Sequence, residues 1–533
     1  MVLASRYPSR PIPDTSLARW FRDAVEGHGD QLAVVDGPTG RSYTFRQLLD
    51  LSVSVAHGLI ARGIMPGDRV AFICPNLPEV ALAYHGVIAA GAVAMMVNPL
   101  STGDELAKYF RVGSPRLALA AAPLVAAIRA VAPGLPVIAM GDAPGIEPDT
   151  EAAIEPFSAL LGGSAVPPAV AVAPDAVAVM PYSSGTTGFP KGVMLTHRNV
   201  IAQCLALDAV TDGDVIVPGA PVLAVLPFFH IYGIMAFLTF GLMRGARLVT
   251  MPRFDLEQYV QLARRHEVPL LHLVPPILLG LAKYPGELQL PQLRVALVGA
   301  APLGAELAAE FTRRTGAMVY QVYGMTEVAG ASHLGSRDPA RNKPGSIGSL
   351  IGSAEARVVS TETGAEAAID VAPGETGEIW VRGPFVMKGY FEDPEATALT
   401  IDRDGWLHTG DIGHVDADGD FWVVDRVKEL IKYKGLQVAP AELEAVLLQH
   451  PAVADCAVYP QADAEAGEIP KAAVVLKRDA AVTADELLQF VQARVSPHKR
   501  LRALRFVDAI PKSASGKILR RVLVAQDRAG SPG

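Results

Sequence analysis

Residues 181–197, with the sequence PYSSGTTGFPKGVMLTH, combine the residue types that bind phosphate. Glycines permit positive φ angles and a close backbone approach, so successive N–H groups can form an anion-binding concavity. The loop's candidate phosphate contacts are Ser183, Ser184, Gly185, Thr186, Thr187 and Lys191. The P-loop pattern GxxxxGK[ST] does not fit, because Pro190 precedes the lysine and Gly192 follows it. We predict a phosphate-binding loop of another kind; the alternative is a Gly/Ser turn between two strands.

Three later stretches place charged side chains where they could help to bind a nucleotide. VYGMTE ends in Glu327, which could bind Mg²⁺ beside the phosphates. GWLHTGDIG presents Asp411, a carboxylate that could hold ribose hydroxyls, and PKSASGK is a second Gly/Ser loop that ends in Lys517. Each stretch is a weak signal alone, because a solvated glutamate, a turn-forming aspartate and a lysine at a helix start are common.

Helical and strand patterns alternate over the first three-quarters of the chain and predict the elements that position these side chains. A strand over 176–180 leads directly into the phosphate loop. The other predicted strands cover 69–74, 92–97, 295–298 and 319–323, and the predicted helices cover 45–62, 77–90, 256–266 and 305–314. This alternation indicates parallel sheets covered by helices on both faces. In such sheets ligands bind in the loops at the carboxyl ends of the strands.

The composition and the predicted elements change at about residue 345 and again in the last hundred or so residues. Residues 345–425 have Gly-rich turns and short strands such as 378–382, which indicates an antiparallel or barrel-like subdomain. The last hundred or so residues predict a small α+β unit, with helices over 439–449 and 485–495 and strands over 453–458, 472–476 and 504–507. We place the boundary near Lys428, which gives domains 1–427 and 428–533. The predicted class is α/β with several subdomains.

Composition excludes several classes of protein. With 533 residues, 50% hydrophobic and 19% charged, the chain can bury the cores of two to four domains or subdomains. A net charge of −8 argues against a nucleic-acid partner. Cys74, Cys204 and Cys456 are scattered and form no CxxC pair, which argues against a disulfide scaffold or zinc site and fits a reducing cytoplasm.

Neither end of the sequence carries a targeting signal that we recognise, and one internal segment needs a membrane test. The first residues lack the apolar stretch of a signal peptide, and the terminal SPG is not a peroxisomal tripeptide. Residues 215–243 have no fixed charge and are long enough to span a bilayer. Because they contain three prolines, we predict a buried strand over 222–226 and a buried helix over 234–243 instead.

Taken together, the motifs resemble those of the adenylate-forming superfamily of acyl- and aryl-CoA ligases, luciferases and peptide-synthetase adenylation domains. SSGTTGFPKG is similar to its signature loop, and YGMTE, GEIWVRGPFVMKGY, WLHTGD, DRVKELIKYKG and PKSASGK are similar to its later motifs, in the family's order. PFFHIYG, VPPI, GAAPLG and IKYKGLQVAPAELEA more closely resemble the 4-coumarate:CoA ligase branch, including bacterial cinnamate:CoA ligases. The resemblance implies attack of a carboxylate on the α-phosphate of Mg·ATP, followed by thioester formation with CoA.

The resemblance also implies roles for the nucleotide-binding residues. The signature loop would hold the β- and γ-phosphates, Thr326 would contact the α-phosphate, and Glu327 would bind Mg²⁺. Asp411 and Arg426 would hold the ribose. The residues that would line the adenine and substrate side are Ala300 and Gln321.

In the family a small, mobile C-terminal domain swings between the two steps, and Lys428 stands at the hinge position. Lys517 would bridge the acid carboxylate and the α-phosphate during adenylation. The residues that would act around AMP during thioester formation are Lys432 and Gln437. The residues that would contact CoA are Lys434, Gly435 and Arg253. Without the resemblance, Lys432 would be a solvated hairpin lysine.

The pocket for the acid is defined less sharply. His230, in the HIY motif, would gate its carboxylate end, although a lone histidine in an apolar run is more often a core residue. PFFHIYGIM contains no aspartate to meet an ammonium group, which disfavours α-amino acids. Tyr232 would form one wall, faced by the small residues Ala236, Ala300, Gly324, Gly330 and Ala331. We expect a large, apolar pocket that accepts cinnamate-like acids and has little preference for a 4-hydroxyl. Medium or long acyl chains remain an alternative substrate.

Three functions remain to be compared. The first is an acid:CoA ligase whose partners are a small carboxylic acid, ATP and CoA, as a monomer or a dimer. The second hands the acyl group to a carrier protein's phosphopantetheine, and Arg253 favours free CoA over it. The third is a non-catalytic nucleotide sensor, which we would expect to lack Glu327 or Lys517. Both residues are present, so we predict the ligase.

Overall fold

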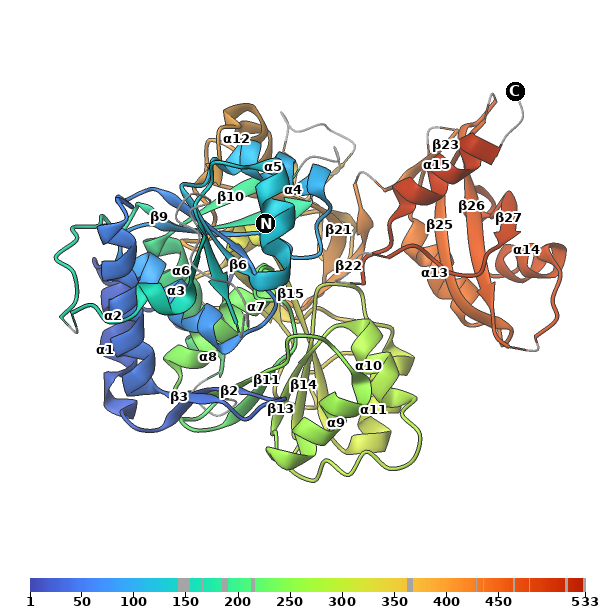
Figure 1. Cartoon of the computed structure of the whole chain (residues 1–533). Coiled ribbons are helices and arrows are strands. Elements are labelled where there is room, and N and C mark those ends of the chain that lie inside the picture. The colour runs from blue at the N-terminus through green and yellow to red at the C-terminus, as the bar shows by residue number, and fades with distance from the viewer. Residues whose placement is uncertain are drawn as a thin grey trace.

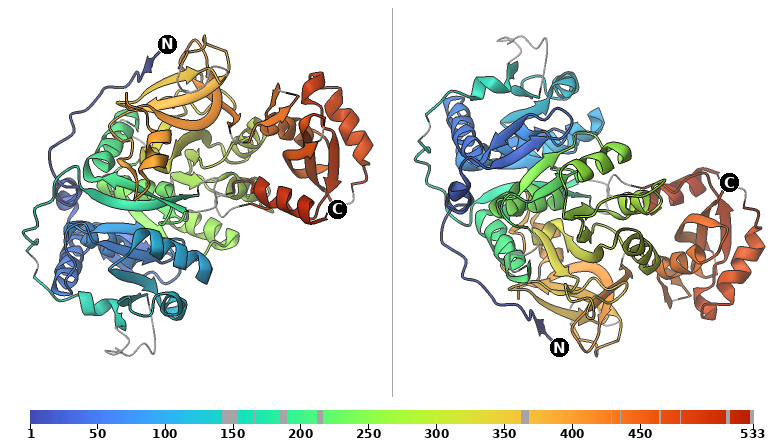
Figure 2. Two further views of the ribbon diagram at one scale, coloured as in Figure 1. Left: turned by 90° about the horizontal axis from the view of Figure 1, so that it is seen from above. Right: turned by 90° about the horizontal axis from the view of Figure 1, so that it is seen from below.

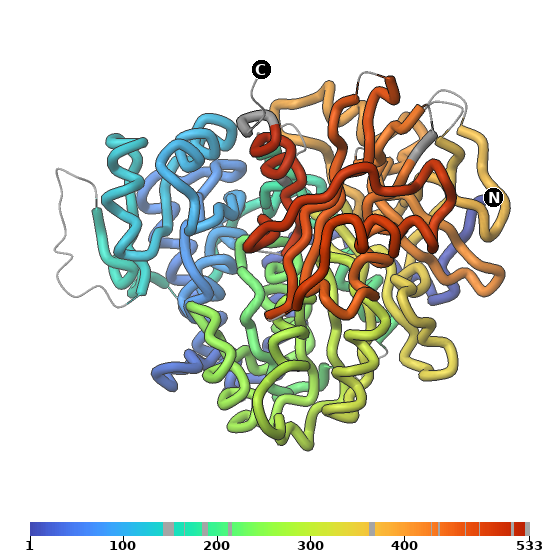
Figure 3. Tube along the Cα trace, turned by 90° about the vertical axis from the view of Figure 1, so that its right-hand side faces the viewer, coloured from blue at the N-terminus to red at the C-terminus, as the bar shows by residue number. Residues whose placement is uncertain are grey.

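The chain forms a large N-terminal lobe and a smaller C-terminal lobe that stands beside it (Figure 1). The computed structural model describes residues 1–141, 154–164, 166–184, 190–211, 216–361, 368–427, 429–434, 436–463, 465–478, 480–512 and 516–530. Viewed from the side of the C-terminal lobe, that lobe lies across the middle of the N-terminal one (Figure 3).

The first of two large sheets carries the phosphate-loop hairpin. Its order is β20 (Gly389–Tyr390), β10 (Pro190–Thr196), β9 (Val177–Ser184), β5 (Val93–Met96), β4 (Arg69–Ile73), β6 (Leu117–Ala121), β7 (Val137–Met140) and β8 (Ile154–Pro156). Strands β9 to β8 run parallel, whereas β10 and β20 are antiparallel additions. The predicted strand 176–180 is confirmed and continues four residues further, to Ser184.

The second large sheet brings the carboxyl ends of its central strands to the candidate site. Its order is β17 (Ser349–Leu350), β16 (Gly330–Leu334), β15 (Met318–Met325), β14 (Val295–Val298), β13 (Leu270–Leu273), β11 (Pro221–Ala224), β12 (Arg247–Thr250), β2 (Leu32–Asp36) and β3 (Ser42–Thr44). From β15 to β2 the strands are parallel. The predicted parallel architecture is therefore confirmed.

Helices cover these sheets and fill the space between them. They are α1 (Leu17–Val25), α2 (Phe45–Ala61), α3 (Pro78–Ala89), α4 (Gly103–Gly113), α5 (Val125–Val131), α6 (His197–Thr211), α9 (Leu256–Arg265), α10 (Pro275–Ala282), α11 (Ala305–Thr315) and α12 (Pro394–Thr400). Helix α3 contacts β5 of one sheet and β2 of the other, and it is buried from Pro78 to Ile88. Its sequence is apolar on all sides except at Glu79 and His85, as this two-sided burial requires.

The uncharged run after residue 215 folds as a strand and a helix, as predicted, but the helix is irregular. It comprises α7 (Ile231–Gly233), the π-helical segment η4 (Ile234–Thr239) and α8 (Phe240–Met243). A Cβ on Gly241 would lie 2.5 Å from the Ala236 carbonyl oxygen, so the wide turn depends on glycine there. Among the residues that the structure describes, no helix has both the length and the apolar character of a membrane span.

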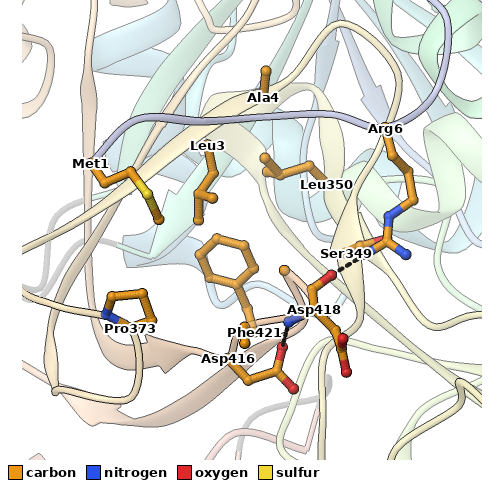
Figure 4. Close-up of a pocket in the computed structure, with 12 residues that line it drawn as sticks. Met1, Leu3, Ala4, Arg6, Ser349, Leu350, Pro373, Asp416, Asp418 and Phe421 are labelled. Atoms are coloured by element: carbon orange, nitrogen blue, oxygen red, sulfur yellow. Dashed lines mark hydrogen bonds between the residues drawn. The ribbon is translucent and has the colours of Figure 1, made fainter.

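A third sheet is antiparallel and includes the N-terminus of the chain. Its order is β1 (Leu3–Ala4), β18 (Glu355–Val359), β19 (Gly377–Arg382), β21 (Leu407–Val415) and β22 (Phe421–Arg426). Met1 and Leu3 line a pocket of about 250 Å³ above Phe421, and Arg6 donates to the carbonyl oxygen of Asp418 at 2.8 Å (Figure 4). From β1 the chain runs as an arm along the outside of the lobe to α1 (Figure 2).

The C-terminal lobe has its own core. Its sheet has the order β24 (Leu436–Val438), β23 (Ile431–Tyr433), β26 (Gly467–Leu476) and β25 (Val453–Asp463), with β27 (Ala503–Phe506) also paired to β26. Its helices are α13 (Pro440–Leu448), α14 (Ala484–Gln492) and α15 (Arg520–Gly530). Leu443, Val458, Val474 and Leu487 are fully buried between the sheet and these helices. The predicted α+β unit is therefore confirmed.

Four buried histidines should make the fold sensitive to mild acid. Burial lowers the pKa of His85 and His333 to about 3 and that of His197 and His272 to about 4, from an ordinary value of 6.5. Between pH 6.5 and 4 these side chains stay neutral in the folded state but take up protons on unfolding. Their contribution is therefore complete above pH 6.5 and is lost as the pH falls, by up to ~1.4 kcal/mol per pH unit for each histidine.

Urea unfolding at pH 7.5, 6.0 and 5.0 measures this loss. The free energy of unfolding should fall steadily below pH 6.5. His85→Phe preserves the stacked contact with Phe21. It should make the fall of the unfolding free energy with pH less steep, by up to the ~1.4 kcal/mol per pH unit that one histidine contributes. A free energy that stays level from pH 7.5 to 5.0 in the wild type would contradict the expectation.

Candidate active site

The phosphate loop is the tip of the hairpin formed by β9 and β10. Ser183 and Lys191 are register partners at the base of this hairpin, so their side chains start side by side. The Lys191 Nζ lies 4.8 Å from the ring centre of Tyr390 and 3.9 Å from Asp393 Oδ2. The base of the hairpin is thus an ordered structure that carries a hydroxyl and a cation. The loop's tip, with the predicted contacts Gly185, Thr186 and Thr187, lies outside the described residues, as does the side chain of Ser184.

Glu327 stands next to this hairpin, in the turn that follows β15. Its side chain is 6% exposed, and its Oε1 accepts a hydrogen bond from the Tyr390 hydroxyl at 2.9 Å. Thr326 precedes it and is also buried. In the described part of the chain no group of three or more His, Cys, Asp or Glu side chains could hold a metal by itself. One carboxylate beside a phosphate loop nevertheless fits Mg²⁺, which is commonly held by one or two carboxylates and the substrate's phosphates.

A second carboxylate, Asp411, is fixed by three neighbours. Its Oδ2 accepts from the Tyr323 hydroxyl at 2.6 Å, and its Oδ1 lies 3.0 Å from the Arg426 Nε. Its backbone N–H donates to the Thr409 Oγ1 at 3.0 Å. Asp411 and Arg426 are register partners on β21 and β22, so the pairing of these strands aligns the two charges. Such a charged, preorganised carboxylate can accept hydrogen bonds from two vicinal hydroxyls.

The predicted adenine side lies at the carboxyl ends of β14 and β15. Ala300 has a positive φ of 70°, a backbone conformation that non-glycine residues seldom adopt. Gln321 lies on β15 and donates from Nε2 to the Ser346 carbonyl oxygen at 2.9 Å. Both residues therefore lie near Asp411, at the same end of the sheet, because Tyr323 on β15 contacts that carboxylate.

Lys517, on the C-terminal lobe, lies near these carboxylates. Burial and the nearby Arg426 charge lower the pKa of its ammonium group, against the attraction of Asp411, Glu327 and Glu429. Its charge also contributes, after burial, to lowering the pKa of His230 to about 4. Lys517 is therefore within electrostatic reach of the two carboxylates and of the histidine. Among the described residues, the predicted site residues Lys517, Glu327, Asp411 and His230 are therefore near one another.

The loop that carries Lys517 rests on helix α10 of the N-terminal lobe. Gly516 has a φ of +83°, and a Cβ built on it would lie 2.8 Å from the Pro276 Cγ. Pro276 is in the first turn of α10. A side chain at position 516 would therefore meet both an unfavourable backbone conformation and a rigid proline ring.

The predicted acid pocket lies beyond His230. The Tyr232 hydroxyl donates to the Leu297 carbonyl oxygen at 3.2 Å. A Cβ on Gly299 would lie 3.2 Å from the Tyr232 Cε1 and 2.7 Å from the Val322 Cγ1, so this wall is tightly packed. Among the predicted pocket residues, Gly330 and Ala331 lie on β16, and Ala236 is buried in η4.

Gly324 has a structural reason to be glycine. A Cβ there would lie 1.8 Å from the Gly330 carbonyl oxygen. The antiparallel pairing of β15 and β16 therefore requires a residue without a side chain at this position. Strand β15 places Tyr323 against Asp411, and the turn between β15 and β16 places Glu327 against Tyr390.

The described side chains predicted for thioester formation are exposed. Lys432 and Lys434 are exposed on the hairpin of β23 and β24, and the Lys434 Nζ lies 2.8 Å from Glu465 Oε1. Arg253 is exposed in the loop before α9. Lys428, Gly435 and the side chain of Gln437 lie outside the described residues. Their predicted roles, like those of the other site residues, stay predictions.

Sequence reasoning missed Tyr390, Tyr323, Pro276 and His272. Tyr390 and Pro276 each stood inside a quoted motif, GEIWVRGPFVMKGY and VPPI, but nothing local to those motifs shows what the side chains touch. His272 interrupts the apolar strand LLHL, and a charged or polar residue in a buried strand is a signal that could have been used.

Asp411→Asn should weaken nucleotide binding. The substitution preserves the size of the side chain but removes the charge that faces Arg426 and Tyr323, and hydrogen bonds to charged groups contribute ~1.5–3 kcal/mol. We expect the KM for ATP to rise ~10-fold or more, with a smaller change in the KM for the acid. Initial rates at varied ATP measure this, and Asp402→Asn, in the turn before β21, is the control. Equal KM values for ATP in the wild type and Asp411→Asn would contradict the ribose role.

Two family models match the chain. AMP-binding enzyme matches residues 21–391, and AMP-binding enzyme C-terminal domain matches residues 442–517. The two matches fall in the two lobes, one on each side of Lys428.

Relatives match over almost the whole length. The chain is 42% identical to 4-coumarate--CoA ligase 5 of Oryza sativa subsp. japonica, over 100% of this chain and 98% of that protein. The crystal structure of ATP-bound MatB from Rhodopseudomonas palustris superimposes with a TM-score of 0.86 at 26% identity, covering 96% of this chain and 99% of that one. O-succinylbenzoate CoA synthetase from Bacillus subtilis, in complex with its acyl-adenylate intermediate, gives 0.82 at 28% identity, with 96% and 98% covered.

Proposed function

We propose that this chain, which belongs to the AMP-binding enzyme family, is an ATP-dependent ligase that joins an aromatic acid of the cinnamate class to coenzyme A. The observation that supports the proposal is that the loop of Lys517 packs against Pro276 of the N-terminal lobe, which brings the lysine within electrostatic reach of Glu327, Asp411 and His230. The full-length likeness to a 4-coumarate--CoA ligase supports both the acid and the acceptor.

The first half-reaction forms an acyl-adenylate. A carboxylate oxygen of the acid attacks the α-phosphorus of ATP, the bond from that phosphorus to the bridging oxygen breaks, and pyrophosphate leaves with the electron pair. Two anions must approach each other, so charge neutralisation and positioning are the protein's main contributions. The Lys517 ammonium is suited to lie between the carboxylate and the α-phosphate, with Thr326 as a further donor.

The nucleotide is held at both ends in this proposal. Ser183, Lys191 and the rest of the phosphate loop bind the β- and γ-phosphates, while Asp411 and Arg426 bind the ribose. Mg²⁺ would be held by Glu327 and would neutralise phosphate charge. Tyr390 orients that carboxylate through its hydrogen bond to Oε1.

The second half-reaction exchanges AMP for CoA. The thiolate sulfur of CoA attacks the acyl carbon, the bond from that carbon to the AMP oxygen breaks, and AMP leaves. We assign Lys432 and Gln437 to AMP, and Lys434, Gly435 and Arg253 to CoA. Because Lys432 is exposed while Lys517 is partly buried against the N-terminal lobe, we infer a rotation of the C-terminal lobe near Lys428 between the two steps.

We also propose a cytoplasmic location, which three buried, unpaired thiols support. Cys74, Cys204 and Cys456 are all free and buried. Burial raises the pKa of each thiol, so none is a thiolate that could act as a nucleophile at neutral pH. The carboxylate of the acid and the thiol of CoA therefore supply the reacting groups.

A coupled assay of pyrophosphate and thioester tests the function. Purified protein, ATP, Mg²⁺ and CoA are incubated separately with cinnamate, 4-coumarate, benzoate, octanoate and palmitate. We expect thioester mainly from the cinnamates. Thioester mainly from octanoate or palmitate would move the protein to the fatty acyl-CoA ligases. Pyrophosphate without thioester would exclude CoA as the acceptor and favour a carrier protein.

A further inference from the structure

A tyrosine and a histidine form a hydrogen-bonded pair beside the predicted acid pocket. His272 on β13 and Leu297 on β14 are register partners in neighbouring parallel strands. The Tyr232 hydroxyl reaches both of them: it donates to the Leu297 carbonyl oxygen at 3.2 Å and lies 3.3 Å from the His272 Nδ1. One phenol therefore fixes the orientation of the imidazole ring.

This pair also fixes the position of the imidazole proton. A phenol has a single proton, and Tyr232 gives it to the carbonyl oxygen, so the His272 Nδ1 must be the donor in the second hydrogen bond. Burial lowers the pKa of His272 to about 4, so the ring carries one proton at neutral pH. The Nε2 atom is therefore a hydrogen-bond acceptor with a free lone pair.

That acceptor is buried and has no hydrogen-bond partner among the described residues. The side chain is 4% exposed, and the ring packs edge-on against Phe237 and Tyr232, with centroid distances of 5.3 and 5.7 Å. Buried polar atoms in native proteins nearly always have a partner, and leaving one without costs stability. In an imidazole, Nε2 lies farther from the backbone than Nδ1, so it points away from β13.

A second buried acceptor lies against the predicted pocket residues Gly330 and Ala331. Gln203 on α6 donates from Nε2 to the Ala331 carbonyl oxygen at 2.9 Å, whereas its Oε1 is buried and without a partner in the described part of the chain. A Cβ on Gly330 would lie 3.4 Å from the Gln203 Nε2, which places the amide directly against this wall. Two acceptors without donors indicate a ligand that supplies donors.

We propose that His272 is a specificity-determining residue for the acid: its Nε2 accepts a hydrogen bond from a hydroxyl or amino group at the far end of an aromatic carboxylic acid. The inference rests on the proposed ligase function and deepens it. It differs from the expectation of an apolar pocket in which a 4-hydroxyl adds little to the binding of the acid. An acid with only an acceptor at that end, such as a methoxy group, is disfavoured because two lone pairs would face each other.

Four acids that differ only at the para position test the proposal: cinnamate, 4-coumarate, 4-aminocinnamate and 4-methoxycinnamate. Wild-type kcat/KM should be ~10-fold or more higher for the hydroxy and amino acids than for cinnamate, and lowest for the methoxy acid. His272→Phe should abolish the preference for the two donors, whereas His272→Gln, which retains an acceptor, should preserve part of it. The ratio between acids within one variant is independent of how much of that variant is folded.

Tyr232→Phe provides a second, independent variant. Without the phenol, the imidazole proton is free to move to Nε2, which then becomes a donor. The ratio of kcat/KM for the 4-methoxy acid to kcat/KM for 4-coumarate should therefore be higher in this variant than in the wild type. Unchanged ratios of 4-coumarate to cinnamate and to the methoxy acid in both His272→Phe and Tyr232→Phe would overturn the proposal. If wild-type protein releases pyrophosphate with none of the four acids, it is the ligase function that fails, and the two failures are thus distinguishable.

Discussion

Lys517→Ala is expected to reduce acyl-adenylate formation by roughly 100- to 1,000-fold, which is the typical effect of removing one preorganised charge-stabilising donor. Lys517 lies within electrostatic reach of Asp411, Glu327 and His230 of the N-terminal lobe. The loss should be specific to the first half-reaction, because Lys432 and Gln437 are the residues proposed for the second.

Two separate assays distinguish an effect on adenylation from an effect on thioester formation. ATP–pyrophosphate exchange measures adenylation, and thioester formation from purified acyl-AMP and CoA measures the second step. Lys512→Ala is the matched control, because Lys512 belongs to the same loop but pairs with Asp455 at the surface of the lobe at 2.5 Å. It should change neither rate by more than a few-fold. Equal losses in both half-reactions for Lys517→Ala would argue against its assignment to adenylation.

Gly516→Ala should produce a similarly selective defect without removing any functional group. The added Cβ would lie 2.8 Å from the Pro276 Cγ, and the backbone φ of +83° is unfavourable for alanine. Together these effects cost ~1–3 kcal/mol in the conformation that delivers Lys517. Adenylation should therefore slow ~10- to 100-fold, whereas thioester formation from acyl-AMP should change little.

The matched control separates the contact from the backbone strain. Gly467 has a comparable φ of +77°, but a Cβ there would meet only the Lys432 carbonyl oxygen, at 3.7 Å. Gly467→Ala should therefore have a smaller effect on adenylation. Pro276→Ala, which removes the opposing Cγ and Cδ atoms, should restore part of the activity of Gly516→Ala. If the double variant is no faster than Gly516→Ala alone, the contact with α10 is not the cause.

The regular elements and their order were predictable because they depend on local patterns. Strand 295–298 was predicted with its exact bounds, and helix 45–62 differs from α2 by one residue. The exception is η4: a continuous apolar run does not distinguish an α-helical turn from a π-helical one. The difference depends on how close Gly241 lies to the Ala236 carbonyl oxygen.

The contacts within the site were not predictable, because they join residues far apart in the chain. Tyr390 and Glu327 are 63 residues apart, and Tyr323 and Asp411 are 88 apart. All four residues stand in motifs that the resemblance identified, but only the fold shows that tyrosines orient both carboxylates. His272 carries no motif, and its importance is visible only once Tyr232 and Leu297 lie beside it.

The arm that begins at Met1 has a consequence for how the protein can be handled. Its first strand pairs with β18 through Leu3 and Ala4 and occupies what would otherwise be the open edge of an antiparallel sheet. Its terminal amine pairs with Asp370. The unpaired N–H and C=O groups of an open edge can form hydrogen bonds with strands of other molecules. Trimming of the first few residues, or a bulky fusion in front of them, would therefore expose a template for aggregation, so affinity tags belong at the opposite terminus.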